Sequence, residues 1–105
     1  MGMGGGSGPA PLHCDERFTV IEDIQKPGYF NVYSRISNES LGFSLDASGL
    51  EVLSLASWGD IFDRLKEINP DAAKTYRELG VHASELSLVF GQAAVEYEER
   101  QKRLK

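Results

Sequence analysis

The sequence is poor in the features that define several common classes of small protein. It has one cysteine, Cys14, among 105 residues, which excludes an internal disulfide framework and a four-cysteine zinc site. No apolar run approaches the ~18–20 residues that cross a bilayer. Acidic residues outnumber basic ones by 16 to 11, so the chain is a poor candidate for a general nucleic-acid coat. The free thiol and the absence of a secretory signal predict a cytoplasmic protein that does not bind membranes.

Catalytic and metal-binding motifs are also missing. The two histidines are His13 and His82, and the cysteine adjoins His13 beside a glycine-rich stretch. A Cys–His nucleophile pair needs a rigid scaffold that holds both side chains within hydrogen-bond reach. No HExxH, GxSxG, lysine-bearing phosphate loop or DxDxDG calcium loop is present. We therefore predict a protein that is not an enzyme and has no cofactor and no metal site.

The residues that are present describe one small domain. Hydrophobic residues make up 41% and charged residues 26% of the chain, which are ordinary globular values. Residues 1–14 are rich in glycine and predict a flexible tail, and residues 15–105 predict a single α+β domain. Residues 1–63 carry nine acids and three bases, a net charge of −6, whereas residues 64–105 carry seven acids and eight bases, a net charge of +1. The β-rich half is therefore expected to present an acidic, solvated face.

Alternating apolar residues across 15–56 predict an antiparallel meander of three to four strands. In residues 29–36, every second side chain from Phe30 onward is apolar or small, and the other face carries Tyr29, Tyr33 and Arg35. Further runs cover 41–45 and, more ambiguously, 50–55. Turn-forming residues at 26–28, 37–40 and 46–49 separate these runs. Short connections of this kind join neighbouring antiparallel strands.

From residue 57 onward the apolar period changes to that of a helix. Two or three helices in 57–105 are expected to pack on one face of the sheet. Ser57 is predicted to cap the first helix together with Asp60, Asn69 and Pro70 to begin the second, and Ser84 to cap the third. The predicted core consists of Phe18, Val20, Phe30, Val32, Ile36, Leu41, Phe43, Ile61, Phe62, Leu65, Ile68, Leu79, Leu86, Val89 and Phe90.

The last helix has two apolar stripes, although a helix on a monomer needs only one. The first stripe contains Leu86, Val89, Phe90, Ala93 and Tyr97, and the second contains Leu88, Gly91 and Val95. A glycine within a helix costs about 1 kcal/mol relative to alanine unless close packing offsets it. Leu88, Gly91 and Val95 are therefore the predicted oligomer interface. The alternative is that they contact another helix of the same domain.

Exposed aromatic residues suggest a surface for a partner. We predict that Tyr29, Tyr33, Arg35 and Trp58 bind another protein, with Trp58 serving as an anchor there or in the core. The leading functional prediction is thus a small non-catalytic protein-binding module, an adaptor or inhibitor-like accessory protein of the kind that phages encode, and a homo-oligomer. The identity of its partner is not encoded in any recognisable motif.

Two alternatives remain open at this point. The stretch 75–86, with its Leu-Gly-Val turn and Ser84, resembles the helix-turn-helix of phage repressors and Cro-like proteins. This resemblance implies a DNA-binding regulator that uses residues 72–90, with Ala83, Ser84 and Ser87 facing the DNA. No lysine or arginine lies on that face, which argues against nucleic acid as a partner. The other alternative is a small-ligand or nucleotide pocket between subunits, with His82 and the tyrosines as its polar groups.

Overall fold

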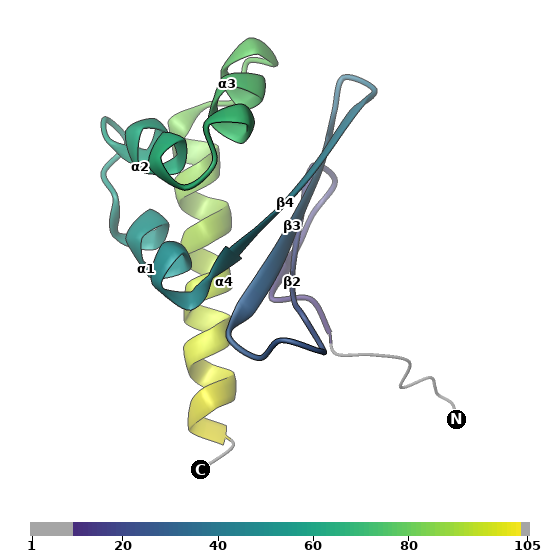
Figure 1. Ribbon diagram of the computed structural model, residues 1–105, viewed down its shortest axis with the longest axis vertical. Helices are drawn as coiled ribbons and strands as arrows, with labels where there is room; N and C mark the ends of the chain where they lie inside the picture. Colours follow the sequence, from purple (N-terminus) through teal and green to yellow (C-terminus); the bar gives the residue numbers. More distant parts are fainter. Residues whose placement is uncertain (1–9, 104–105) are drawn as a thin grey trace.

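The alternating residues of the N-terminal half form an antiparallel sheet, and the rest of the chain forms helices that cover one of its faces (Figure 1). This computed structural model describes residues 10–103. The strands lie in chain order, as β1 (His13–Cys14), β2 (Phe18–Glu22), β3 (Tyr29–Ile36) and β4 (Glu39–Asp46). The helices are α1 (Ala47–Leu55), α2 (Ile61–Ile68), α3 (Pro70–Glu78) and α4 (Ala83–Arg103). The predicted α+β fold is confirmed.

The β3–β4 hairpin fixes the register of the sheet. Its two turn residues, Ser37 and Asn38, have φ angles of 52° and 68°, as a type I′ turn requires. From this turn, β3 pairs with β4 without interruption, from Ile36 opposite Glu39 to Tyr29 opposite Asp46. The even-numbered residues of β3 therefore face the helices, and the odd-numbered residues face away from them.

The predicted strand over 50–55 is wrong, because this segment lies in α1. The carboxylate of Asp46 accepts a hydrogen bond of 2.7 Å from the amide of Gly49, so the predicted turn at 46–49 is the start of a helix. Leu50 and Leu53, three residues apart, are buried together on one side of α1. The helical part thus begins at residue 47 and contains four helices. The fourth strand of the sheet is β1.

The N-terminal boundary of the domain also differs from the prediction. Residues 1–9 of the predicted tail lie outside the described residues. Leu12 is buried and its amide donates to the carbonyl of Val20, while His13–Cys14 pair with β2. The guanidinium of Arg100 on α4 donates to the carbonyl oxygens of Ala10 and Pro11, at 2.8 and 2.9 Å. The folded domain therefore begins before residue 15.

The predicted helix caps are correct in one case of three. Asn69 caps α3 by accepting a hydrogen bond from the amide of Ala72, and Pro70 is the first helical residue, as predicted. The helix predicted from Ser57 begins only at Ile61, and the Ser57 hydroxyl donates to the carboxylate of Asp60 instead of capping the backbone.

Helix α4 begins at Ala83, so Ser84 lies inside its first turn and does not occupy the predicted cap position. The amides of Glu85 and Leu86 donate instead to the carbonyl of His82. The backbone oxygen of His82 thus accepts hydrogen bonds at the start of the helix, whereas the sequence pattern predicted that the Ser84 hydroxyl would be the acceptor there.

The core lies between the sheet and the helices. Most predicted core residues are buried, and Leu41, Phe62, Ile68 and Leu79 are partly buried against them. The prediction missed Tyr76, which is fully buried and packs edge-on against Phe18 and Phe43, at centroid distances of 5.5 and 6.4 Å. A tyrosine in α3 thus fills the space between the sheet and the helical layer.

Candidate interaction surfaces

The second stripe of α4 is exposed. We call it the outer face of α4 and define it as Leu88, Gly91, Gln92 and Val95. Leu88 is 55% exposed and Val95 is 61% exposed, whereas the first stripe, from Leu86 to Ala93, is buried. A Cβ atom added at Gly91 would meet no other atom within 4 Å. Nothing within the described subunit therefore uses the small size of Gly91.

A shallow groove follows the outer face of α4. It has a volume of about 560 Å³ and runs between Leu12 and the α4 residues from Ser87 to Glu96. A second hollow shares Ser87 and Leu88 with it and is bordered by Trp58 and His82. The two hollows form one continuous surface along the N-terminal half of α4. Its apolar side chains contact solvent in the isolated subunit.

Trp58 belongs to this surface and not to the sheet. It lies in the turn before α2, is 66% exposed and shares a hollow with Leu88. Trp58 is therefore absent from the core. Tyr29 and Tyr33 lie on the face of the sheet that the helices leave open, as exposed odd-numbered residues of β3. The structure thus divides the predicted partner-binding residues between two surfaces.

The open face of the sheet carries the remaining predicted residues. Tyr29 and Tyr33 are about half exposed, and Arg35 is exposed at the end of the same strand. The ring of Tyr33 covers Gly42 on β4, where an added Cβ would lie 3.3 Å from it. The ammonium group of Lys26 lies 5.8 Å from the centroid of the Tyr29 ring. These side chains form a row along β3 that helices do not cover.

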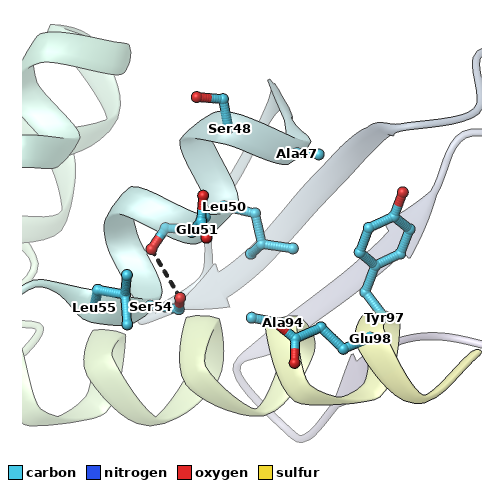
Figure 2. Close-up of a pocket in the computed structure, with 9 residues that line it drawn as sticks. All are labelled: Ala47, Ser48, Leu50, Glu51, Ser54, Leu55, Ala94, Tyr97 and Glu98. Carbon is cyan, nitrogen blue, oxygen red and sulfur yellow. Dashed lines mark hydrogen bonds between the residues drawn. The ribbon is translucent and has the colours of Figure 1, made fainter. Parts of the chain in front are cut away.

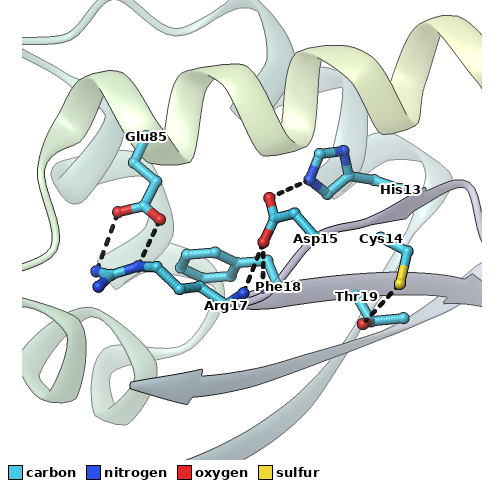
Figure 3. Close-up of polar contacts among 7 residues, drawn as sticks. All are labelled: His13, Cys14, Asp15, Arg17, Phe18, Thr19 and Glu85. Carbon is cyan, nitrogen blue, oxygen red and sulfur yellow. Dashed lines mark hydrogen bonds and ion pairs between the residues drawn. The ribbon is translucent and has the colours of Figure 1, made fainter. Parts of the chain in front are cut away.

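Polar contacts join the first strands to α4 (Figure 3). The guanidinium of Arg17 pairs with the carboxylate of Glu85 at 2.7 Å. The carboxylate of Asp15 accepts hydrogen bonds from His13 Nε2 and from the amides of Arg17 and Phe18. Burial raises the pKa of Asp15, but these hydrogen bonds outweigh that effect and lower it below its ordinary value. The arrangement holds the β1–β2 turn in place.

His13, Cys14 and Asp15 do not form a nucleophilic triad. The Cys14 thiol lies 3.7 Å from the Thr19 hydroxyl and is exposed, while the His13 ring points to Asp15 (Figure 3). A nucleophile needs a base within hydrogen-bond reach. Among the described residues, no three histidine, cysteine or acidic side chains lie close enough to hold a metal ion.

A small pocket of about 300 Å³ lies between α1 and the C-terminal half of α4 (Figure 2). Leu50 and Tyr97 form its apolar wall, and Glu51 and Glu98 border its opening. The polar groups expected in a ligand pocket, His82 and the tyrosines of β3, are elsewhere: His82 lies beside Trp58 and the tyrosines on the open sheet face. One subunit therefore does not bring the predicted ligand-binding groups together.

The segment 72–90 does form two helices joined by a short turn. Helix α3 ends near Gly80, whose φ of 79° makes the turn, and α4 begins at Ala83. Ser84 is exposed, and Ala83 and Ser87 are partly exposed. Glu85 projects from the same turn and is paired with Arg17. The predicted DNA-facing residues thus lie next to a carboxylate and near the outer face of α4.

Comparison of the chain with known protein families, with characterised proteins and with solved structures finds no match. In the part of the chain that the structure describes, no helix is long and apolar enough to cross a membrane. The function must therefore be argued from the surfaces themselves.

Proposed function

We propose that this protein is a non-catalytic protein-binding module that works as a homodimer, with the outer face of α4 as the dimer interface. The observation that carries the proposal is the pair of exposed apolar residues Leu88 and Val95 on either side of Gly91. Glycine at this position destabilises the helix by about 1 kcal/mol relative to alanine. Close approach of another helix is the packing role that offsets such a cost.

A second copy of α4 fits this face in an antiparallel orientation. If the two helices cross between Gly91 and Gln92, residue numbers that sum to 183 lie opposite each other. Leu88 of one copy then meets Val95 of the other, and the two glycines permit close contact at the crossing. A two-fold interface of this kind is self-complementary, because the contact between Leu88 of one copy and Val95 of the other occurs twice.

The charges at the two ends of α4 support the same arrangement. In the antiparallel pair, Glu99 of one helix lies opposite Ser84 in the first turn of the other, where Glu85 is already paired with Arg17. The N-terminus of a helix carries partial positive charge and attracts carboxylates. A parallel pair would instead bring Glu99 of both copies together. The antiparallel dimer therefore places Glu99 near an attractive helix terminus.

The remaining parts of the proposal concern the partner and the compartment. The dimer leaves the open sheet face, with Tyr29, Tyr33 and Arg35, available to another protein. No group of catalytic side chains is aligned among the described residues, so binding is the activity that we propose. The exposed free thiol of Cys14 supports a reducing compartment, and we propose the cytoplasm.

Sedimentation velocity of matched variants tests this proposal. We expect the wild-type protein to sediment as a dimer at micromolar concentrations. Leu88→Asp places a charge in the interface and should give monomers, because burying an unpaired carboxylate costs several kcal/mol. Ile24→Asp is the control: it makes the same kind of change at a residue that is 71% exposed in the β2–β3 loop, and it should leave the dimer intact. A monomeric wild-type protein would contradict the proposal.

A further inference from the structure

The two edges of the sheet differ in their protection. The β1 edge has two residues and contacts α4. The β4 edge has eight residues and pairs with β3 along its whole length without a bulge. Natural proteins protect long edges with proline, lysine, bulges or a covering element, and β4 contains no proline and no lysine. This long edge is therefore open to backbone pairing.

The hydrogen-bond phase of the hairpin shows which backbone groups are free. The residues that flank a two-residue turn, Ile36 and Glu39, form a hydrogen-bonded pair. The same phase recurs at the far end of the hairpin, where the amide of Ala47 donates to the carbonyl of Gly28 at 2.9 Å. On the other side of β3, the amide of Arg35 donates to the carbonyl of Arg17. Even-numbered residues of β3 thus bond to β4, and odd-numbered residues bond to β2.

It follows that the backbone groups of β4 that point away from β3 belong to its even-numbered residues. The amide and carbonyl groups of Ser40, Gly42 and Ser44 point away from β3. Among residues 10–103, no backbone group makes a turn, loop or cap hydrogen bond with any of these three residues. Their side chains are small and lie on the open face of the sheet, so nothing bulky stands between these backbone groups and an incoming strand.

The charges on β4 select the kind of strand that would pair there. Its two ionisable residues, Glu39 and Asp46, stand at its two ends and are exposed. Antiparallel self-pairing of two β4 strands would place Glu39 of one copy beside Asp46 of the other at each end, and like charges on neighbouring strands are destabilising. Arg35 lies on the neighbouring strand β3, opposite Ser40. A strand with basic residues at its ends complements this edge better than a second copy does.

We propose that β4 is the docking site for an extended segment of a partner protein, with basic residues flanking it, which adds to the sheet as a fifth strand. Main-chain hydrogen bonds to Ser40, Gly42 and Ser44 supply the affinity, as in other cases of strand addition. Glu39 and Asp46 pair with the flanking cations, and the exposed ring of Tyr33 beside Gly42 offers an apolar contact. This inference rests on the proposed protein-binding function and names its partner surface.

A fluorescent peptide as long as β4 tests the proposal with the full-length protein. The probe alternates valine and threonine and carries lysine at each end. We expect a rise in fluorescence anisotropy on binding, and slower amide exchange by NMR at Ser40, Gly42 and Ser44. The same peptide with glutamate at each end should bind about tenfold or more weakly, because two favourable charge contacts become repulsive.

Two variants of Ser44 separate backbone pairing from side-chain contact. Ser44→Pro removes the outward amide without breaking a backbone hydrogen bond to β3, and it should lower peptide affinity about tenfold or more. Ser44→Ala keeps the amide and loses only the hydroxyl bond to Asn31, so it should bind like the wild-type protein. Equal binding by Ser44→Pro and Ser44→Ala, or unchanged exchange at the three amides, would overturn the inference.

The dimer and the docking edge can fail separately. Leu88→Asp should still bind the lysine-flanked peptide, because β4 does not contribute to the outer face of α4. If the protein is a dimer but the peptide leaves the β4 amides unprotected, the docking inference is wrong and the dimer stands. If the peptide binds β4 of a monomeric protein, the docking inference holds and the proposed dimer is wrong. Protection of the β4 amides by dimerisation alone would instead indicate self-pairing and overturn the inference.

Discussion

At the scale of single residues, Tyr76 shows a conflict between packing and polarity. Its ring fills the core between Phe18 and Phe43, yet its hydroxyl has no hydrogen-bond partner among residues 10–103. Burial raises the pKa of this hydroxyl, since the charged form is disfavoured away from water. The nearest polar candidate, Ser34, donates to the carbonyl of Leu41 instead. The unpaired phenol oxygen thus lowers the stability of the fold, and the contacts of the tyrosine ring offset this loss.

We therefore predict that Tyr76→Phe stabilises the protein. The change keeps both aromatic contacts and removes the unpaired oxygen, and leaving a buried polar group unpaired costs about 1–3 kcal/mol. The free energy of unfolding, measured by urea denaturation of monomeric Leu88→Asp with and without the change, should rise by about 1 kcal/mol. A fall of similar size would contradict this reading and would mean that the hydroxyl bonds to Ser34.

A second prediction at this scale concerns pH and Asp15. Its pKa is lower in the folded protein than the ordinary value of 3.8, so the carboxylate stabilises the fold above that pH. This contribution is lost as pH falls through the folded pKa. The wild-type protein should therefore lose more stability between pH 5 and pH 2 than Asp15→Asn does. Urea denaturation across this range checks it, and parallel curves for the two proteins would contradict it.

At the scale of elements, a substitution at Gly91 is expected to have opposite effects on the stability of α4 and on dimerisation. An added Cβ contacts nothing within the subunit, and alanine favours the helix by about 1 kcal/mol over glycine. Gly91→Ala should therefore raise the free energy of unfolding of the monomeric Leu88→Asp variant. In the wild-type background it should weaken the dimer, because the extra methyl groups meet at the crossing.

Urea denaturation and sedimentation equilibrium measure these two effects. Glu98→Ala, a change at an exposed residue of α4 that is not part of the outer face, is the control for a general effect of alanine in this helix. If Gly91→Ala strengthens both the helix and the dimer, the close crossing of two α4 helices is wrong.

The sequence predicts some elements of this protein well and others poorly, for physical reasons. Local signals sufficed for the hairpin around Ser37 and for the start of α3 at Asn69 and Pro70. They failed for 50–55, where leucines and a valine fit both a strand and a helix. Only the Asp46 cap and the joint burial of Leu50 and Leu53 decide for a helix, and burial depends on the rest of the fold.

The candidate surfaces show the same limit. The exposure of Leu88 and Val95 follows from the two stripes of α4, which the sequence displays. The location of Trp58 beside Leu88, away from the tyrosines, depends on how α2 packs against α4. The open edge at β4 could not be read from residues 39–46 either. Whether a strand lies at an edge is decided by which strands pair, and β4 is an edge because 50–55 lies in α1 and does not pair with it.

At the scale of the whole molecule, two separate surfaces carry the two proposed interactions, dimerisation and partner binding. The helical layer presents the outer face of α4 to a second copy, and the sheet presents its β4 edge to a partner strand (Figure 1). Six of the nine acids of residues 1–63 lie in or beside the strands, where a basic partner is proposed. A small domain buries only about 60–65% of its unfolded surface, so a dimer interface also adds stability that the subunit lacks.

The measurement that tests this account most directly is the distance between spin labels in the dimer, recorded by pulsed electron resonance. Labels are placed at Glu98→Cys or Lys102→Cys in a Cys14→Ser background, away from the crossing. An antiparallel crossing predicts labels about 20 Å apart at position 98 and about 30 Å apart at position 102, given a rise of about 1.5 Å per residue. The absence of any intermolecular coupling at position 98, or a shorter distance at position 102 than at position 98, would contradict it.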